Sequence, residues 1–600
     1  MVADDALARI LPSVERPGRY TGGETNSVVK PFDSVGFRLA LAFPDVYDIA
    51  MSHLGLQILY GLVNARRDAL AERVFMPWLD MERAMRDAAV PLFSLESRRP
   101  VSEFDCLGFS LQYEMCLPTV LTMLDLARIP RRRKDRRKGR YPLIIAGGPC
   151  TFNPEPLADF VDLFFIGDGE DSLPAFIDVY LKTPAGGPAA IVSAAARTIP
   201  GVYAPELYLL DGPRLVPVDS GVPAVVSPSI VRDLDSAFYP VAPIVPLVEA
   251  VHERISLEIM RGCSRGCRFC QAGMTRRPVR LRSVAKLLSL AKAIYRNTGF
   301  DEISLLSLAT GDYPYLEDLA RRLNHHFAPL AVSLSFPSLR ADEALANIPG
   351  IMAEVRKGAV TVAAEAGSER LRAVINKGIT EPGILDGLAG AFEAGWNRVK
   401  LYFMVGLPTE DQEDIAAIAD LVDKILAIGQ RFRRAPQVNI SVAPFVPKPG
   451  TPFQWEPMAP RAYLESARAA LFARLRRSSV KLSFHDVNRS IVEGALARGG
   501  REIGPALAHA ADLGCRLDAW DEAFEFSRWR EAFASAGLDI EAYACRRLPH
   551  DEHLAWAHIS PGVTAAFLRR EHDRALDQLA TPDCRFSACH GCGLSCPPPE

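Results

Sequence analysis

The feature that most constrains the fold is a repeated alternation of short apolar runs with helical stretches. Over residues 37–171 the apolar runs are FRLALAFP, CLGFSLQY, YPLIIAGGP and DLFFIGDGE, with amphipathic stretches between them. Strand and helix alternating at this pace indicate a doubly wound parallel sheet. We therefore predict a Rossmann-like α/β domain over residues 1–200.

The alternation returns after residue 250 with six further strand candidates: ISLEIM, DEISLLSLA, AVSLSF, AVTVAAEA, RVKLYFMVG and VNISVAPF. Six strands with intervening helices predict a partial (βα)6 TIM barrel over residues 251–480, with its chemistry at the carboxyl ends of the strands. Between the two regions, residues 201–250 contain eight prolines and predict a bridging segment with short hairpins. Residues 481–600 have a helical pattern and predict a helical C-terminal extension that ends in a cysteine-rich tail.

Composition indicates the general class of protein and does not indicate its reaction. A formal net charge of -3 and 48% hydrophobic residues are typical of a globular protein, and no apolar run reaches the ~18 residues that span a bilayer. The N-terminus lacks the features of a secretory signal, so we expect a cytoplasmic protein without membrane contact. The basic run RRRKDRRKGR, residues 131–140, contains no aromatic residue, and we interpret it as a solvated loop rather than an RNA site.

Three of the twelve cysteines lie close together directly after the first barrel strand. Cys263, Cys267 and Cys270 have the spacing C-x3-C-x2-C. Three thiolates can bind three irons of a 4Fe-4S cluster and leave the fourth iron open to another ligand. Three structural cysteines or most of a zinc site have the same spacing, and position at a strand end favours the cluster.

The stretch RGCSRGCRFCQAG, with an aromatic residue before the last cysteine, resembles the cluster-binding loop of the radical S-adenosylmethionine (SAM) superfamily. The resemblance implies an enzyme in which Cys263, Cys267 and Cys270 hold the cluster and SAM chelates the fourth iron. One electron, from a donor such as flavodoxin or ferredoxin, would then cleave SAM to methionine and a 5′-deoxyadenosyl radical.

Three later stretches, SLATGDY, AAEAGSERL and LYFMVGLPTE, are similar to the strand ends of the same superfamily. The alternative is that the glycines and prolines of these loops only set the conformation of the backbone and contact no ligand. By the resemblance, the residues that contact SAM are Ser307, Thr310, Gly311, Asp312, Glu365, Ser368, Gly406 and Pro408.

The first domain resembles the cobalamin-binding domain that precedes many radical SAM barrels. Glycines at strand ends would let a flat corrin approach the backbone, although ordinary Rossmann turns also use them. The D-x-H-x-x-G loop that supplies a histidine to cobalt is absent, because His53 and Gly55 stand at the wrong offsets from Asp48. We therefore expect cobalamin without this histidine. The residues implied to contact it are Ser110, Gly147, Gly148, Gly167 and Gly169.

Four more cysteines close the chain as C-x4-C-x2-C-x3-C, a pattern that predicts a second Fe–S cluster or a zinc ion. They are Cys584, Cys589, Cys592 and Cys596.

Two enzyme classes remain open from the sequence. The first is cobalamin-dependent methylation or rearrangement at an unactivated carbon. The second is sulfur insertion as in methylthiotransferases, with RNA as one candidate substrate. In that class Cys106, Cys116 and Cys150 would hold another cluster. The substrate, whether a small molecule, a protein or RNA, is not specified by these motifs.

Overall fold

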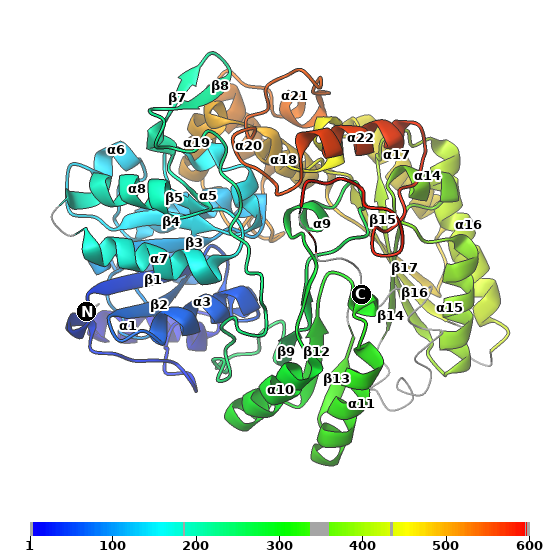
Figure 1. Ribbon diagram of the computed structural model, residues 1–600, viewed down its shortest axis with the longest axis horizontal. Coiled ribbons are helices and arrows are strands. Elements are labelled where there is room, and N and C mark those ends of the chain that lie inside the picture. Colours follow the sequence, from blue (N-terminus) through cyan, green and yellow to red (C-terminus); the bar gives the residue numbers. More distant parts are fainter. Residues whose placement is uncertain (1–3, 184–185, 337–358, 433–435, 595, 597–600) are drawn as a thin grey trace.

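The computed structural model describes residues 4–183, 186–336, 359–432, 436–594 and 596. An N-terminal α/β body and a barrel-like body lie side by side, and the helices of the C-terminal extension lie across both of them (Figure 1). The predicted division into an α/β domain, a barrel and a helical extension is therefore visible in the arrangement of the elements.

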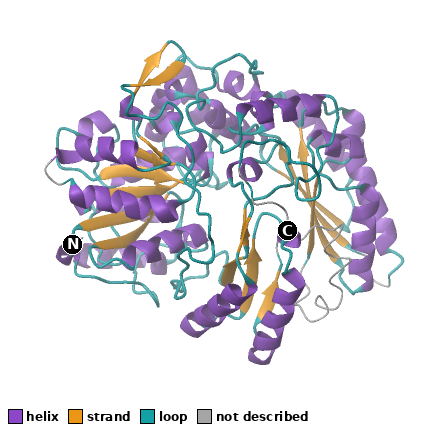
Figure 2. Cartoon of the chain, viewed as in Figure 1, coloured by secondary structure: helices purple, strands orange, loops and turns teal. Residues whose placement is uncertain are grey.

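The N-terminal sheet has the order β2-β1-β3-β4-β5-β6, parallel except for β6. Helices cover both of its faces (Figure 2). Successive residues of β1 face opposite cores: Leu39 packs with the core that includes α7 and α8, and Ala40 packs with the core that includes α4 and α5. The strands are β1 (Phe37–Phe43), β2 (Ala69–Phe75), β3 (Cys106–Ser110), β4 (Leu143–Gly147), β5 (Leu163–Phe165) and β6 (Val202–Tyr203). The helices are α1 (Asp4–Ile10), α2 (Tyr47–Ala50), α3 (Leu54–Asn64), α4 (Leu79–Asp87), α5 (Leu117–Leu126), α6 (Arg133–Arg136), α7 (Gly169–Lys182) and α8 (Gly187–Thr198).

The barrel-like body consists of two parallel sheets, ordered β13-β12-β9 and β14-β15-β16-β17, in the described part of the chain. The predicted strands all occur, and one strand more, β17, extends the second sheet past residue 480. The strands are β9 (Ile255–Glu258), β12 (Glu302–Leu306), β13 (Ser333–Ser335), β14 (Val360–Glu365), β15 (Arg398–Val405), β16 (Gln437–Pro444) and β17 (Val480–Phe484). The short ribbon β10 (Met260–Arg261) and β11 (Arg280–Leu281) flanks the helix α9 (Gln271–Thr275). The outer helices are α10 (Val284–Thr298), α11 (Leu316–Phe327), α14 (Glu369–Val374), α15 (Glu381–Glu393), α16 (Gln412–Gly429) and α17 (Arg461–Arg474).

The bridging segment contains the predicted hairpin, β7 (Tyr208–Asp211) with β8 (Arg214–Pro217). The extension is helical as predicted, with α18 (Val487–Arg498), α19 (Gly504–Asp512), α20 (Phe526–Ser535), α21 (Ile540–Cys545) and α22 (Ala565–Leu576). The three parts meet at a half-buried lysine: Lys448 of the barrel pairs with Glu114 of the first domain at 2.6 Å and with Glu493 of α18 at 2.7 Å.

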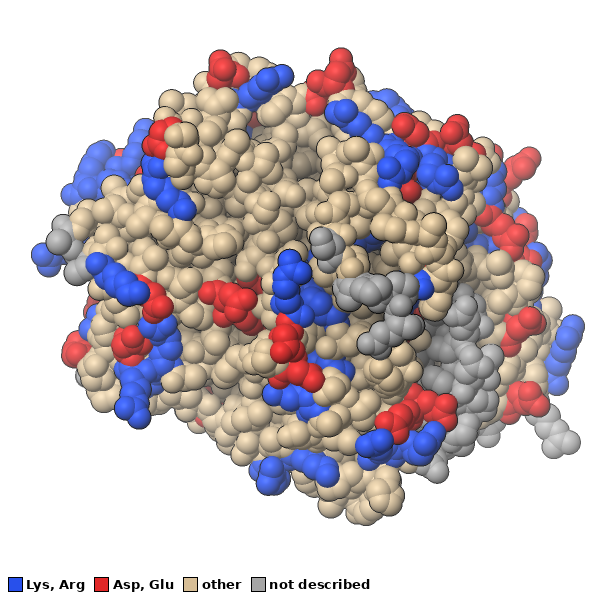
Figure 3. Space-filling model, viewed as in Figure 1, with Lys and Arg blue, Asp and Glu red and all other residues tan. Residues whose placement is uncertain are grey.

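The face of the molecule shown in Figure 3, as far as its residues are described, has no large area of one charge. Basic and acidic side chains are interspersed over the face shown in Figure 3. Among the described helices, none combines the length and the apolar character that crossing a bilayer requires.

Candidate functional site

A cavity of about 450 Å³ lies between the carboxyl edge of the N-terminal sheet and the first loops of the barrel. Side chains from the sheet and from α3, including Leu41, Ile58 and Ile145, form an apolar side. Ser307 and the residues that flank the cysteine triplet, among them Arg261 and Gly262, form the other side. The cavity therefore connects the first domain with the strand-end loops of the barrel.

The predicted cobalamin contacts Ser110, Gly147, Gly148, Gly167 and Gly169 all line this cavity. Their glycines serve different purposes. A Cβ on Gly147 would fit without a clash, since its nearest neighbour is Phe165 at the ordinary contact distance of 3.9 Å. Gly147 is thus the position where absence of a side chain leaves room for a ligand.

At the other three positions, neighbouring atoms of the protein itself leave no room for a side chain. Gly148 and Gly167 have positive φ, and a Cβ there would lie 2.4 Å from the carbonyl oxygen of Leu111 and 2.2 Å from that of Ser229. A Cβ on Gly169 would meet Leu59 at 3.0 Å. Close backbone packing explains Gly148 and Gly167 without a ligand, and the contact with the Leu59 side chain explains Gly169.

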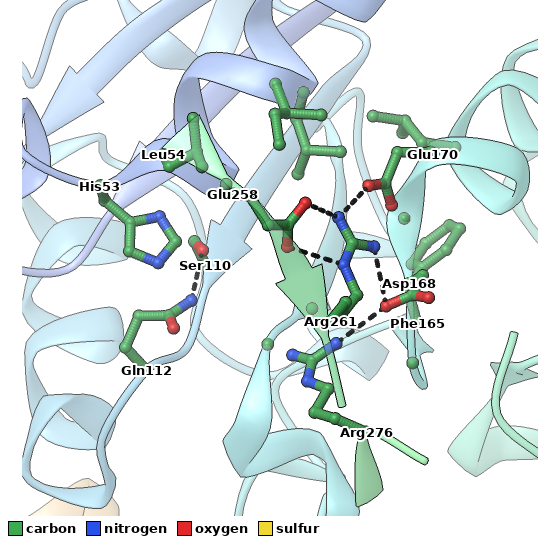
Figure 4. A pocket seen from close by; sticks show the side chains of 18 of the residues that line it. His53, Leu54, Ser110, Gln112, Phe165, Asp168, Glu170, Glu258, Arg261 and Arg276 are labelled. Atoms are coloured by element: carbon green, nitrogen blue, oxygen red, sulfur yellow. Dashed lines mark hydrogen bonds and ion pairs between the residues drawn. The ribbon is translucent and has the colours of Figure 1, made fainter. Parts of the chain in front are cut away.

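A network of charged side chains forms the polar wall of the cavity (Figure 4). Arg261 lies at its centre and pairs with Asp168 at 3.1 Å, Glu170 at 2.8 Å and Glu258 at 2.9 Å. Arg276 reaches the same Asp168 oxygen at 3.1 Å. Since Asp168 and Glu170 belong to the first domain and the arginines to the barrel, the network fixes the two bodies across the cavity.

Asp168 remains ionised in this setting. Burial alone would raise the pKa of its carboxyl, but the neighbouring Arg261, Arg280 and Arg276 hold the pKa below its usual value. Arg280 makes the shortest contact, 2.7 Å. A buried carboxylate with several cationic partners is a rigid structural element.

His53 also lines the cavity, although the sequence pattern gave it no role. Its Nδ1 accepts a hydrogen bond from the backbone N–H of Leu56 at 3.1 Å, so the neutral ring carries its proton on Nε2. Gln112 is the hydrogen-bond partner of the ring and donates in turn to Ser110 Oγ at 2.9 Å. Burial lowers the pKa of His53 to about 4, so the ring is neutral at physiological pH.

The cysteine triplet lies in the loop between β10 and α9. Positive φ at Gly262 and Gly266 shapes this loop, and the Sγ of Cys270 accepts a hydrogen bond from Gly273 N at 3.3 Å as the cap of α9. Burial, with the nearby thiol of Cys267, raises the pKa of Cys270 to about 12. Burial also raises the pKa of Cys263, and buried thiols of this kind are typical of a site that needs a metal to hold them as thiolates.

The predicted SAM contacts after β12 adjoin this loop. Ser307 and the buried Thr310 hydrogen-bond to each other at 3.0 Å, and Gly311 lies between Thr310 and Asp312 in one 3-10 turn. Asp312 pairs with Arg265 of the cysteine loop and, at 3.0 Å, with Arg585 of the tail.

The remaining predicted contacts lie at the ends of β14 and β15. Glu365 pairs with Lys377 at 3.0 Å, and Lys377 lies over the ring of Phe269 in the cysteine loop. Ser368 caps α14 and donates to Asp414. Gly406, with φ of 80°, and Pro408 form a buried turn.

The C-terminal tail packs directly on the cysteine loop. Ser264 donates to Asp583 at 3.1 Å, and Asp583 pairs with Arg585 at 2.7 Å. Cys592 is buried in a small apolar cluster with Met274 of α9. Cys584 is partly buried, whereas Cys589 and Cys596 are exposed. These contacts place the tail beside the cysteine loop, but among the described residues neither cysteine set has three Sγ atoms within 4.8 Å of one another.

Two side chains that the motifs did not reveal hold this region together. Arg268, between the last two cysteines, is fully buried and reaches Glu571 of α22 at 3.1 Å. Asn376 donates to the backbone of Arg265 at 3.1 Å and accepts from Thr581 N at 2.8 Å. The only sequence signal for Arg268 was its place inside the cysteine motif.

The cysteines of the alternative second cluster are not gathered. Cys106 and Cys150 belong to different apolar cores, and Cys116 packs against the core of Cys150. Burial raises the pKa of all three thiols, to about 12 for Cys116. This is the environment of inert structural cysteines.

The basic run differs from the predicted solvated loop. Arg136 is buried and pairs with Asp162 at 2.9 Å, and Arg131 reaches Asp512 of α19 at 2.7 Å. Part of the run is therefore satisfied inside the protein, because nearby carboxylates in the fold compensate its charge.

Comparison with known proteins identifies the family. Residues 55–205 match the family model described as radical SAM proteins, N-terminal, and residues 257–422 match that of the radical SAM superfamily. An uncharacterized protein of Methanocaldococcus jannaschii is 31% identical over 432 residues, which are 71% of this chain and 84% of that protein. The chain belongs to the radical SAM superfamily. It is accordingly a radical SAM enzyme, and the expected superfamily is confirmed.

Two further similarities are more distant. A tRNA-2-methylthio-N(6)-dimethylallyladenosine synthase of Porphyromonas gingivalis is 26% identical over 239 residues, covering 37% of this chain and 49% of the synthase. The radical SAM methyltransferase TsrM of Kitasatospora setae, in a structure with cobalamin and a 4Fe-4S cluster bound, has a TM-score of 0.50 at 12% identity. This match covers 84% of the present chain and all of that chain. At this identity it shows a shared fold.

Proposed function

We propose that this radical SAM enzyme binds cobalamin in the cavity between its two α/β bodies and uses it to methylate or rearrange an unactivated carbon. In this proposal Cys263, Cys267 and Cys270 hold the 4Fe-4S cluster, and SAM binds beside it. The cavity next to the cysteine loop is the observation on which the proposal rests.

The residues fit a flat corrin in two respects. Gly147 lines the cavity at a strand end and has no side chain there, and an apolar side of the cavity faces a charged wall. A corrin combines a broad apolar plane with a rim of amides, which the side chains around Asp168 and Arg261 can bind. The TsrM structure, which has cobalamin bound in a related fold, agrees with this assignment.

The chemistry of each cofactor sets the task of the protein. When bound, the cluster supplies the electron that splits SAM, and cobalamin supplies a methyl group to a carbon radical. The chain must hold both close together and exclude water and oxygen. The network around Arg261 performs the first task by fixing the first domain against the barrel, and apolar side chains such as Leu41 and Ile145 perform the second.

His53 is unsuited to bind cobalt in the arrangement described. Its Nδ1 lone pair is used by the N–H of Leu56, and its Nε2 carries the proton. The proposal therefore keeps the predicted cobalamin binding without this histidine as a cobalt ligand.

The tail is proposed as a second metal centre bound by Cys584, Cys589, Cys592 and Cys596. Its contacts with the cysteine loop, through Ser264 and Asp583, support a role near the first cluster. A sulfur-inserting reaction remains the second candidate, because such an enzyme needs another cluster beside the first and because the partial similarity to a methylthio-tRNA synthase points the same way.

The partners follow from the reaction class. A radical SAM enzyme needs a substrate and a source of electrons, and we propose flavodoxin or ferredoxin as the donor in a cytoplasmic setting. Single-electron transfer from such a protein would take place without a membrane.

The experiment for the proposed cluster is anaerobic reduction with SAM and quantification of 5′-deoxyadenosine. The triple variant C263A/C267A/C270A should form none, whereas the control C545A, which removes a thiol remote from the motif, should form as much as the wild type. Undiminished 5′-deoxyadenosine from the triple variant would refute the assignment.

A further inference from the structure

Two histidines in the last part of the extension, His550 and His572, contact each other edge to face, with ring centroids 4.9 Å apart. The Nε2 of His550 and the Nδ1 of His572 are 2.9 Å apart. A carboxylate oxygen of Asp573 lies 4.0 Å from the same Nδ1. In the described residues, this is the group of three potential ligand atoms that lie within 4.8 Å of one another.

A buried carboxylate fixes the proton of His572. Glu456, which is 1% exposed, lies 2.7 Å from the Nε2 of His572 and also pairs with Arg547. Because Glu456 is the anionic partner of Arg547, it accepts in its contact with His572, so Nε2 donates to it and Nδ1 presents a lone pair toward His550.

This arrangement is the one that metal-binding histidines share. A ligating imidazole usually donates its second ring N–H to a carboxylate, which orients the ring and increases its basicity. With metal–nitrogen bonds of about 2.0–2.1 Å, two ligands of a tetrahedral site lie roughly 3.3 Å apart. The observed 2.9 Å between the two nitrogens thus requires little movement.

The surroundings hold the rings and leave one side open. Trp455 packs against both imidazoles, at 4.6 Å from His550 and 5.6 Å from His572 between ring centroids. Asp573, in contrast, has a side chain that is 64% exposed and could close over an ion from solvent. Trp455 and Glu456 follow the barrel strand β16, whereas His572 and Asp573 belong to α22.

We propose that His550, His572 and Asp573 form a mononuclear site for a divalent metal ion of the Zn²⁺ type, with Glu456 as the group that orients His572. A water molecule would complete a tetrahedral set of two nitrogens and one oxygen. The ion would join α22 to the barrel segment that ends in Glu456. Because α22 also carries Glu571, the partner of Arg268, the site would secure the C-terminal tail against the cysteine loop.

The proposal is independent of the cysteines and can be tested apart from SAM cleavage. The binding of Zn²⁺, and of Co²⁺ as its spectroscopic substitute, is measured on the full chain after its thiols have been loaded with iron and sulfide. Wild-type protein should bind one Co²⁺ with visible d–d bands that lack thiolate charge-transfer absorption. H572Q should lose this one equivalent of Zn²⁺ or Co²⁺.

Two further variants keep the test decisive. D573N changes an exposed side chain and should fold normally, and we expect its Zn²⁺ affinity to fall at least tenfold. H553Q, which changes a histidine three residues from His550 and outside the group, should bind like the wild type. If H572Q and D573N both bind as much Zn²⁺ as the wild type, or if the Co²⁺ spectrum shows thiolate ligation, the site does not exist.

Discussion

Replacing Glu571 by glutamine should loosen the C-terminal helix from the cysteine loop. Arg268 lies in the middle of the cysteine motif with its side chain fully buried, and Glu571, 3% exposed, is its anionic partner at 3.1 Å. The same guanidinium also donates to the carbonyl oxygens of Val374 at 2.9 Å and Leu579 at 2.7 Å. E571Q keeps the size of the side chain and removes its charge.

The magnitude follows from the burial of the pair. Removing one partner of a buried ion pair costs about 3–5 kcal/mol, because the other charge stays in a low-dielectric environment. Glutamine can still accept one hydrogen bond from Arg268, and the backbone carbonyls remain, so we expect the lower end, about 3 kcal/mol. At about 1.4 kcal/mol per factor of ten, this corresponds to roughly a hundredfold increase in the local opening equilibrium of α22.

Hydrogen–deuterium exchange read by peptide mass spectrometry is the suitable assay, since a chain of several bodies need not unfold in two states. Peptides from α22 and from residues 263–270 should exchange roughly a hundred times faster in E571Q. The control is E317Q on α11, where the pair with Arg321 is 66% exposed on both sides and contributes only about 0.2–0.5 kcal/mol. Equal protection of α22 in the wild type and E571Q would refute the reasoning.

Three other predictions concern ionisation and the tail. The pKa of His53 is about 4 in the folded protein against an ordinary value of 6.5, so its contribution to stability should be complete above about pH 6.5 and be lost as the pH falls toward 4. Denaturant unfolding of H53Q should lack this dependence of the unfolding free energy on pH. An unchanged pH dependence in H53Q would contradict the prediction. Burial raises the pKa of Glu410 to about 7, so its contribution to stability is lost as the pH rises from about 4.5 to 7. E410Q should therefore be more stable than the wild type at pH 8. Equal denaturant midpoints of the two proteins at pH 8 would contradict this. Iron and zinc counts on C584S/C589S/C596S should fall by one metal centre while 5′-deoxyadenosine formation at the first cluster persists in a single turnover; an unchanged metal content would show that the tail is not a site.

The sequence predicted those strands whose side chains follow a simple apolar pattern and missed the ones that contain buried charges. The edge strand β2, ALAERVF, was not predicted, because Glu72 and Arg73 interrupt its apolar run. In the fold Arg73 is 1% exposed and pairs with Glu24 at 2.7 Å and Glu96 at 2.6 Å. Both partners lie outside the strand, so local periodicity cannot reveal the compensation.

In the candidate site, too, residues that are close in the sequence could be predicted, and residues that only the fold brings together could not. Motif spacing was sufficient for the cysteine triplet, because all its ligands lie within eight residues and one loop. The histidine at the cavity was discounted because His53 does not fit a known spacing, yet the turn before α3 places it on the cavity. The pair His550 and His572 could not be recognised either, since only the packing of α22 brings the two rings together.

The central claim is that the cavity between the two α/β bodies binds a corrin, and retention of cobalamin tests it most directly. Protein incubated with hydroxocobalamin is passed through a desalting column, and the bound corrin is quantified by its absorption. We compare the wild type with G147L, whose side chain would enter the cavity that Gly147 lines, and with G390L on the exposed face of α15, where a Cβ meets nothing within 4 Å. The account predicts close to one corrin per chain for the wild type and G390L and a loss of at least tenfold for G147L. Wild-type protein that retains no corrin, or a G147L variant that retains as much as the wild type, would contradict it.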